Sequence, residues 1–274
     1  MSNVLNNFVI TTCDICQAAK KIKSNFTMGP DCIPAFFVKD CVSCLSEPLC
    51  HLFNLIVREA TSPNKWNTAK VVLVLKNGKR QNVKNYRPIA IISNFANIFE
   101  SILAISLSSQ IACKISDSQH GFMKGRSTST NLCEYVQYLS HALDNRKQVD
   151  VLYTDLSKAF DVVNHSILLS KLSAFGLCEN LVNLFKSLLV NRKQFVEYHG
   201  YRSQTFNTCS GVTQGSNLGP ILFVLYINDA LLHFRCRVFV YADDLKVANY
   251  IDSADDCELL QYELNTFEKW CTSN

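Results

Sequence analysis

The chain has 274 residues, of which 48% are hydrophobic and 18% charged, with 9 glycines and 6 prolines. This composition is typical of a globular protein and excludes a disordered, collagen-like or low-complexity chain. Thirteen cysteines without a secretion signal indicate reduced, mostly buried thiols. The longest apolar run, residues 221–227, is far shorter than the roughly 20 residues of a membrane helix, so no membrane partner is expected.

The net charge of +4 is unevenly distributed. Residues 1–150 hold 17 Lys and Arg against 10 Asp and Glu, a net +7, whereas residues 151–274 hold 10 against 13, a net −3. Between Lys65 and Arg87 there are seven basic residues and no acidic one, with Trp66 and Tyr86 among them. Such a segment suits a polyanion, either nucleic acid or a nucleoside triphosphate, but a solvated strand–turn–strand explains it equally well.

The first half of the chain is mainly helical by pattern. Apolar residues at helical spacing predict helices over 14–23, 35–60, 94–112 and from about 130 to 143, separated by a Gly-Pro break and a Gly- and Ser-rich loop. A β-branched run predicts a strand at 69–75, and the Asn77-Gly78 pair after it is a strong turn signal.

The second half alternates strands with helices. Strands are predicted at 149–155, 195–201 and 204–208, helices at 164–175, 179–191 and 220–232, and a hairpin at 234–250 with Ala242-Asp243-Asp244 at its tip. The alternation in the first strand places Asp155 on the face that carries apolar residues. The order of elements indicates an α+β domain in which helices cover one face of a sheet.

Three carboxylates stand where apolar strands end: Asp155, Asp243 and Asp244. Adjacent carboxylates raise one another's pKa unless a cation neutralises them, and their oxygens suit Mg²⁺. Two such ions about 4 Å apart can activate a hydroxyl nucleophile and stabilise a leaving pyrophosphate. The alternative is structural, in which Asp243-Asp244 favours a tight turn and Asp155 caps the next helix.

Five motifs follow one another in a characteristic order and spacing. They are residues 85–89 (Asn-Tyr-Arg-Pro-Ile), 119–127 (Gln-His-Gly-Phe-Met-Lys-Gly-Arg-Ser), 155–161 (Asp-Leu-Ser-Lys-Ala-Phe-Asp), 211–220 (Gly-Val-Thr-Gln-Gly-Ser-Asn-Leu-Gly-Pro) and 241–244 (Tyr-Ala-Asp-Asp). Together they resemble the reverse transcriptase domain of non-LTR, LINE-type retrotransposons. The sequence Tyr-Ile-Asn-Asp at 226–229 is similar to the jockey-like branch.

The resemblance implies an α+β, right-hand polymerase fold with fingers and a ferredoxin-like palm. Residues 1–148 would form the fingers-side region, with the family motifs from about residue 60 onward, and residues 149–274 the palm, ending before the thumb. It also implies that Asp155, Asp243 and Asp244, together with the backbone carbonyl of Leu156, hold two Mg²⁺ ions, for which Mn²⁺ can substitute.

The implied activity is RNA-directed DNA polymerisation, in which a primer 3′-hydroxyl attacks a dNTP on an RNA template, with action in the nucleus. Arg87 and Lys76 would hold the triphosphate, although Lys79 or Arg80 could replace Lys76 across the turn. Phe160 would exclude a 2′-hydroxyl, and Gln214 would contact nucleotide and template. The residues expected to contact nucleic acid are Lys124, Arg126 and Tyr241.

The sequence also departs from the family pattern. Thr213 replaces a usual proline and Asn217 a usual apolar residue, which predicts a looser loop. The thumb and the endonuclease of complete elements are expected to be missing, so poor processivity is predicted. Two alternatives remain: an inactive retroelement remnant that only binds nucleic acid, and a related polymerase of the group II intron type.

The cysteines offer a competing metal site. Cys13 and Cys16, and Cys41 and Cys44, have the spacing of zinc-ligand pairs, with Cys50-His51 close by. The 24 residues between the pairs exceed the usual gap, and both pairs fall on helical or apolar stretches. Buried thiols are therefore favoured over a zinc site.

Overall fold

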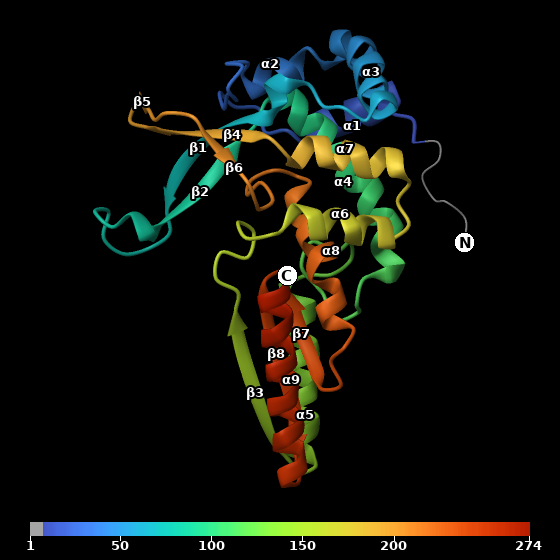
Figure 1. Cartoon of the computed structure of the whole chain (residues 1–274), viewed down its shortest axis with the longest axis vertical. Helices are drawn as coiled ribbons and strands as arrows, with labels where there is room; N and C mark the ends of the chain where they lie inside the picture. Colours follow the sequence, from blue (N-terminus) through green and yellow to red (C-terminus); the bar gives the residue numbers. More distant parts are fainter. Residues whose placement is uncertain (1–7) are drawn as a thin grey trace.

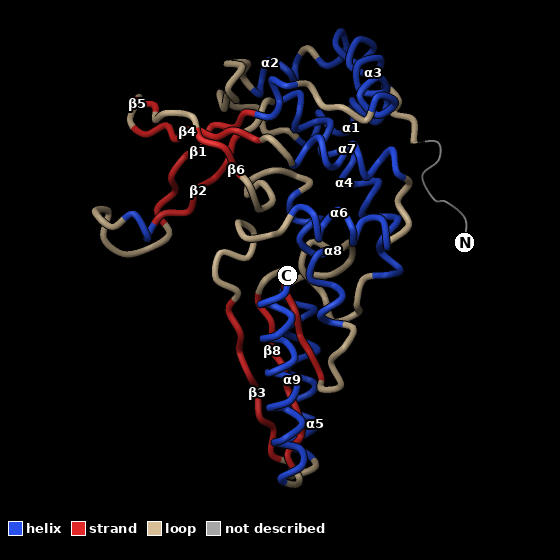
Figure 2. Tube along the Cα trace, in the orientation of Figure 1, coloured by secondary structure: helices blue, strands red, loops and turns tan. Residues whose placement is uncertain are grey.

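The computed structural model describes residues 8–274 and contains two β-sheets connected by helices. Figure 1 shows the smaller sheet in a long, narrow lower part, with the larger sheet and most helices above it. Figure 2 shows helices beside strands in both parts. The mixed architecture confirms the predicted α+β class.

The smaller sheet has three antiparallel strands in the order β3 (Gln148–Asp155), β8 (Asp244–Ile251) and β7 (Arg237–Tyr241). α5 (Thr128–Asp144) covers one face, where the Tyr138 ring stacks on Tyr250 at 4.5 Å. α9 (Ala254–Ser273) packs against β8 on the opposite face, which buries Leu245 and Val247. The prediction that helices cover one face only is therefore wrong, because aromatic residues of α5 bury the second face.

The larger sheet has five strands and includes segments far apart in the sequence. β1 (Thr68–Leu75) pairs antiparallel with β2 (Tyr86–Ile91) and parallel with β4 (Arg192–Tyr198), which also pairs with β5 (Tyr201–Arg202) and β6 (Phe206–Thr208). The strands predicted over 195–208 thus join β1 rather than the three-stranded sheet. A division at residue 148 does not separate the two sheets, because periodicity identifies a strand but not its partner.

Helices form the core between the sheets. They are α1 (Thr12–Lys21), α2 (Ala35–Asp40), α3 (Val42–Glu59), α4 (Asn94–Ile111), α6 (His165–Ala174), α7 (Glu179–Leu189) and α8 (Gly219–Leu231). The rings of Phe53, Trp66 and Phe99 contact one another at its centre, with centroids 5.1–6.0 Å apart. The single helix predicted over 35–60 is two helices that meet at Cys41, since α2 packs on α4 whereas α3 packs on α7.

One segment, Asn94–Lys114, is long and apolar enough to span a membrane by length and mean hydropathy. Half of this segment is buried within the protein, and Glu100 is among its buried residues. α4 lies against α1, α2 and α8, so its position in the core accounts for its apolar composition.

Candidate active site

The three predicted carboxylates lie together at one end of the three-stranded sheet. Asp155, the last residue of β3, is directly opposite Asp244, the first residue of β8. Tyr241 pairs with the same Asp244, so the hairpin turn consists of Ala242 and Asp243. Directly opposed residues in antiparallel strands have Cβ atoms about 5 Å apart, so Asp155 and Asp244 present neighbouring carboxylates.

Asp243 is the most buried of the three acids. Burial raises the pKa of its carboxyl group, the charges of Asp244 and Asp155 raise it further, and Arg87 lowers it. Excess negative potential and hard oxygen donors are the chemistry that a divalent cation satisfies. Within residues 8–274, however, no three His, Cys, Asp or Glu side chains are arranged to hold a metal ion by themselves.

The segment after β3 is joined to residues 209–220 by backbone hydrogen bonds. The Gly211 N–H donates to the Val163 carbonyl over 2.8 Å, and the Val212 N–H donates to the Phe160 carbonyl over the same distance. A Cβ atom on Gly211 would lie 2.7 Å from the Asp161 carbonyl oxygen, so this close approach requires glycine. The predicted substrate loop therefore lies directly on the motif that begins with Asp155.

The same loop also reaches β2. The Ala90 N–H donates to the Gln214 carbonyl over 2.9 Å, and a cavity of about 360 Å³ lies between this loop and strands β1, β2 and β4. Gln214 lines this cavity. Asn217 is exposed and donates to the Asn97 side chain, so a polar partner compensates for the missing apolar residue. These bonds restrain the loop despite Thr213.

Phe160 contacts two other aromatic rings. Its ring stacks on Phe223 of α8 with centroids 4.6 Å apart, and Phe122 approaches edge-on at 6.5 Å. Phe122 is 45% exposed and has a positive φ of 58°. The side chain of Phe160 is thus fixed by packing but remains partly accessible. Sequence reasoning did not single out Phe122.

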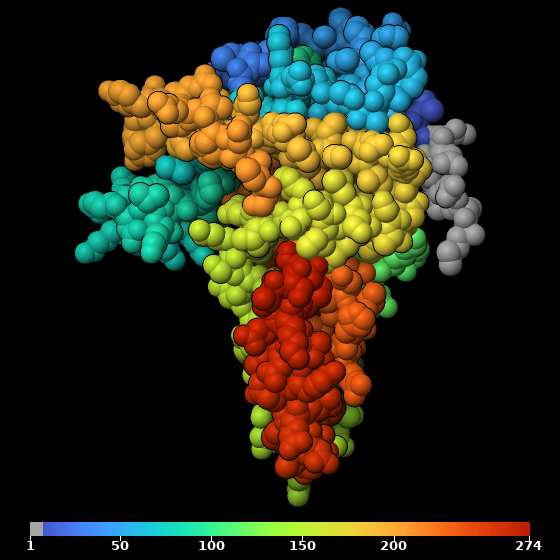
Figure 3. All heavy atoms as spheres, viewed as in Figure 1, coloured from blue at the N-terminus to red at the C-terminus, as the bar shows by residue number. Residues whose placement is uncertain are grey.

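The predicted triphosphate ligands lie on the arm formed by β1, β2 and their connection, which projects from the body in Figure 3. Arg87 and Lys76 are both exposed, and neither forms a salt bridge with another described residue. Arg87 is close enough to Asp243 to lower the pKa of that carboxyl group. Arg87, near the end of β2 that adjoins the connection, therefore lies near the carboxylates.

The predicted nucleic-acid contacts differ in their availability. Lys124 is exposed, and Tyr241 lines a cavity of about 330 Å³ that Asp244 also lines. The Arg126 guanidinium instead donates to the carbonyls of Ser116, Asp117 and Gln119 and pairs with the Asp117 carboxylate. Its donors are occupied within its own loop, which favours a structural role. The Leu156 carbonyl accepts the Ala159 N–H over 3.2 Å.

A lysine and two tyrosines beside the carboxylates were not predicted from the sequence. Tyr153 is directly opposite Lys246, two residues along the strands from the pair Asp155–Asp244. The Lys246 ammonium lies 4.5 Å from the ring centre of Tyr135, whose hydroxyl is 2.9 Å from that of Tyr153. No charge run or motif marks these residues, because only strand pairing brings them together.

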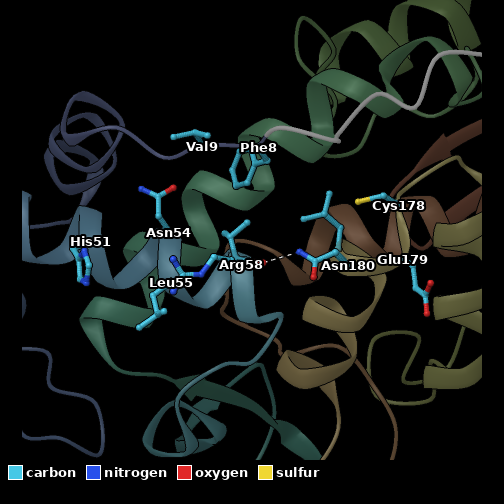
Figure 4. Close-up of a pocket in the computed structure, with 11 residues that line it drawn as sticks. Phe8, Val9, His51, Asn54, Leu55, Arg58, Cys178, Glu179 and Asn180 are labelled. Atoms are coloured by element: carbon cyan, nitrogen blue, oxygen red, sulfur yellow. Dashed lines mark hydrogen bonds between the residues drawn. The ribbon is translucent and has the colours of Figure 1, made fainter.

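Two other candidate sites lie elsewhere. Figure 4 shows a pocket of about 720 Å³ between α3 and α7, lined by residues such as His51 and Arg58, where the Asn180 amide donates to the Val57 carbonyl. None of the predicted carboxylate, nucleotide or nucleic-acid ligands lines it. Among residues 8–274 the cysteines form no group that could hold a metal ion. The prediction of mostly buried thiols is wrong, because only Cys236 is buried and the other cysteines are exposed or half-buried.

Comparison with known proteins agrees with the arrangement of these motifs. Residues 74–274 match the family model described as reverse transcriptase (RNA-dependent DNA polymerase). The chain is 30% identical, over 80% of its length, to the "Probable RNA-directed DNA polymerase from transposon X-element" of Drosophila melanogaster and to the "RNA-directed DNA polymerase from mobile element jockey" of Drosophila funebris.

A further relative is the "Retrovirus-related Pol polyprotein from type-1 retrotransposable element R2" of Popillia japonica, which is 31% identical over 67% of the chain and 27% of the relative. The alignments cover 25% of each of the first two relatives, so the chain spans about a quarter of the length of the curated proteins it matches. The family model covers most of the chain, and the chain therefore belongs to the reverse transcriptase family.

Proposed function

We propose that this chain is an RNA-directed DNA polymerase core of a non-LTR retrotransposon, which extends a DNA primer on an RNA template. The observation that carries the proposal is the direct pairing of Asp155 with Asp244 beside the turn residue Asp243. In this reaction the primer 3′-hydroxyl attacks the α-phosphate of a dNTP and pyrophosphate leaves. Family membership supports the same reaction class.

In this proposal the three-stranded sheet with α8 and α9 is the palm, and the five-stranded sheet with the N-terminal helices belongs to the fingers side. The charge of each sheet supports the division, because the carboxylates end one sheet and the exposed basic arm extends from the other. β4–β6 join the fingers side through β1, although they fall within residues 149–274.

Asp155, Asp243 and Asp244 would hold Mg²⁺ or Mn²⁺, because carboxylate oxygens are the donors that these ions prefer. In residues 8–274 no three such side chains are arranged to hold an ion by themselves, so substrate or water oxygens would complete the coordination. When bound, two such ions lower the pKa of the attacking hydroxyl and neutralise charge on the departing pyrophosphate. The Leu156 carbonyl has one accepted hydrogen bond and retains a second lone pair for a ligand.

The remaining residues would bind the nucleotide. Arg87 would pair with phosphate oxygens through its planar guanidinium, with Lys76 as a second cation from the same arm. Phe160 would lie against the sugar, where a rigid ring offers no hydrogen bond to a 2′-hydroxyl. Gln214 would contact the base pair from the loop that adjoins both β2 and Phe160.

For the nucleic acid, Lys124 and Tyr241 are the proposed contacts, since the former is exposed and the latter lies beside Asp244. Phosphate contacts of this kind fix the register of a strand without reading its sequence. Lys246 adds a further cation on the same face as the carboxylates. Arg126 would act indirectly by holding the loop that carries Lys124.

Primer extension tests the proposal, with oligo(dT) on poly(rA), dTTP and either Mg²⁺ or Mn²⁺. We expect incorporation by the wild-type chain and none by Asp243→Asn. If neither protein incorporates dTTP but both bind the template–primer, the binding-only alternative replaces the polymerase. Incorporation that survives Asp243→Asn would show that the assigned carboxylates do not carry the activity.

A further inference from the structure

Gln119 is a completely buried polar residue next to the candidate active site, with 0% of its surface exposed. It lies in the loop before α5, 123 residues from the hairpin turn that it contacts. A buried amide must find partners for its oxygen and its nitrogen, because each unpaired polar group costs about 1–3 kcal/mol. Its partners therefore indicate what this side chain is arranged to hold.

Both ends of the amide bond to the backbone of Ala242. The Ala242 N–H donates to Gln119 Oε1 over 2.9 Å, and Gln119 Nε2 donates to the Ala242 carbonyl over 3.3 Å. The Gly121 N–H donates to the same Oε1 over 2.7 Å. One side chain thus replaces the strand partner that the first residue of a two-residue turn lacks.

The backbone of Ala242 needs this support. Its φ of +59° lies in the left-handed region, which costs a residue with a Cβ atom roughly 1–2 kcal/mol. Ala242 is also buried, so water does not satisfy its backbone groups. The residue that follows is Asp243, whose position depends directly on this conformation.

The loop approaches the turn so closely that only glycine fits at position 121. A Cβ atom there would lie 2.3 Å from the Ala242 nitrogen. On the same side, the His120 N–H donates to the Val240 carbonyl over 2.8 Å, and the Val240 N–H donates to the Ser118 carbonyl over 3.1 Å. The loop therefore extends the edge of β7 up to the turn.

We propose that Gln119 is a positioning residue that fixes the Ala242–Asp243 turn, and through it the placement of the Asp243 carboxylate for cation binding. This inference rests on the proposed function for its consequence in catalysis. The motif at 119–127, expected on the fingers side, thereby has a part in the carboxylate site. Loss of a residue that orients a metal ligand typically weakens metal binding or activity by about 10–100-fold.

Asn228 of α8 provides a matched control that contacts the same loop. Its buried amide also bridges backbone groups: the Ser116 N–H donates to Asn228 Oδ1 over 2.8 Å, and Asn228 Nδ2 donates to the Lys114 carbonyl over 3.0 Å. These bonds are at the far end of the loop and do not involve the turn. Replacing Asn228 removes comparable hydrogen bonds without releasing Ala242.

The test compares Gln119→Met with Asn228→Leu in the full chain. Mn²⁺ binding to protein alone is measured from the electron paramagnetic resonance signal of free Mn²⁺, and kcat is measured by primer extension at saturating metal. Gln119→Met is expected to weaken Mn²⁺ binding and to lower kcat by about tenfold or more, with the KM for template–primer unchanged. Asn228→Leu is expected to lower Tm to a similar extent but to change neither Mn²⁺ binding nor kcat.

Gln119→Glu keeps the shape and the acceptor oxygen but replaces the amide donor that faces the Ala242 carbonyl. An intermediate loss of Mn²⁺ binding is expected, and this variant also serves if Gln119→Met does not fold. Equal effects of the Gln119 and Asn228 variants would overturn the positioning role while leaving the polymerase intact. If the wild type binds Mn²⁺ but incorporates no nucleotide, weaker binding by the Gln119 variants still supports the positioning role.

Discussion

The two sheets differ in the charged groups that they carry. The three-stranded sheet ends in Asp155 and Asp244, with Asp243 in the adjoining turn, whereas the five-stranded sheet carries Arg87 and an exposed basic connection between β1 and β2. The two halves of the sequence only approximate this division. β4 and β5 bring Arg192, Lys193 and Arg202 from the acidic half into the basic sheet. The three carboxylates therefore belong to one sheet and the exposed basic connection to the other, and a triphosphate and its counterions are expected between them.

The largest effect is expected from removing a carboxylate at the acidic end of the three-stranded sheet. Asp155→Asn keeps the shape of the side chain but removes a proposed cation ligand, and we expect incorporation to fall by at least about 10³-fold. Primer extension measures this loss. Asp161→Asn, an exposed acid six residues further along, is the matched control and should retain most activity. Equal losses would mean that general charge, and not the paired carboxylate, matters.

The basic sheet also has a buried charge that joins it to the helical core. Arg192 Nη2 of β4 lies 3.6 Å from Glu100 Oε1 of α4, and both residues are buried. Burial raises the pKa of Glu100 and Arg192 opposes that shift. Arg192→Ala leaves an unpaired buried carboxyl group, so the free energy of unfolding should fall by about 3–5 kcal/mol. Urea denaturation measures this free energy of unfolding.

The double variant Glu100→Leu/Arg192→Met removes both charges and should be much closer to the wild type in stability. If the single and double variants are equally unstable, the loss comes from packing of the arginine stem and not from the stranded charge.

Removing the cation that lowers the pKa of Asp243 tests the role of the basic arm. Arg87→Ala should raise the KM for dNTP by about tenfold or more, because a charge-assisted hydrogen bond is worth about 1.5–3 kcal/mol. Lys84→Ala removes the same charge from the same arm and should change this KM little. Steady-state kinetics at fixed template–primer measure both. A similar rise in both variants would show that the arm attracts nucleotides only through its summed charge.

The ring of Phe160 is expected to govern the choice between deoxyribose and ribose in the incoming nucleotide. Phe160→Val should lower the preference for dNTP over rNTP, measured as a ratio of kcat/KM values, by roughly tenfold. Phe122→Val alters the neighbouring exposed ring and is the matched control. If only the Phe122 variant changes the ratio, the discriminating ring has been misassigned.

The smallest expected effect is on stability. Since the folded protein raises the pKa of Asp243, its ionised form opposes folding, and this destabilisation develops as pH rises through the raised pKa. Without metal, Asp243→Asn should therefore raise Tm at pH 7 by about 2 °C and reduce the gain that the wild type shows on acidification. Thermal melts between pH 4 and pH 8 measure this. A lower Tm for Asp243→Asn would contradict the prediction that ionised Asp243 destabilises the folded protein.

Local patterns predicted much of the fold and the central part of the site. The alternation at 149–155 and the hairpin at 234–250 were confirmed as β3, β7 and β8, and their pairing brings the three acids together. These features depend on neighbours in sequence or on a two-residue turn. Such signals are present in any short window of the chain.

Features that depend on distant contacts could not be predicted in this way. One of the two partners of β1 is β4, whose Lys193 pairs with Thr68 across 125 residues, and Gln119 contacts its turn across 123 residues. Position 119 has neither charge nor unusual spacing, so its role is visible only from its hydrogen bonds. The break at Cys41 likewise reflects which neighbours α2 and α3 contact, and not a local breaker residue.

The parallel pairing of β1 with β4 has a consequence for how the chain folds during synthesis. Because Thr68–Val72 pair with Lys193–Glu197, β1 has an open edge until the second partner has been made. Contacts of such long range are slow to form, and an unpaired apolar strand edge can associate with other chains. A nascent chain that has not reached Arg192 therefore leaves one edge of β1 unpaired, and aggregation at this edge is a risk until β4 emerges.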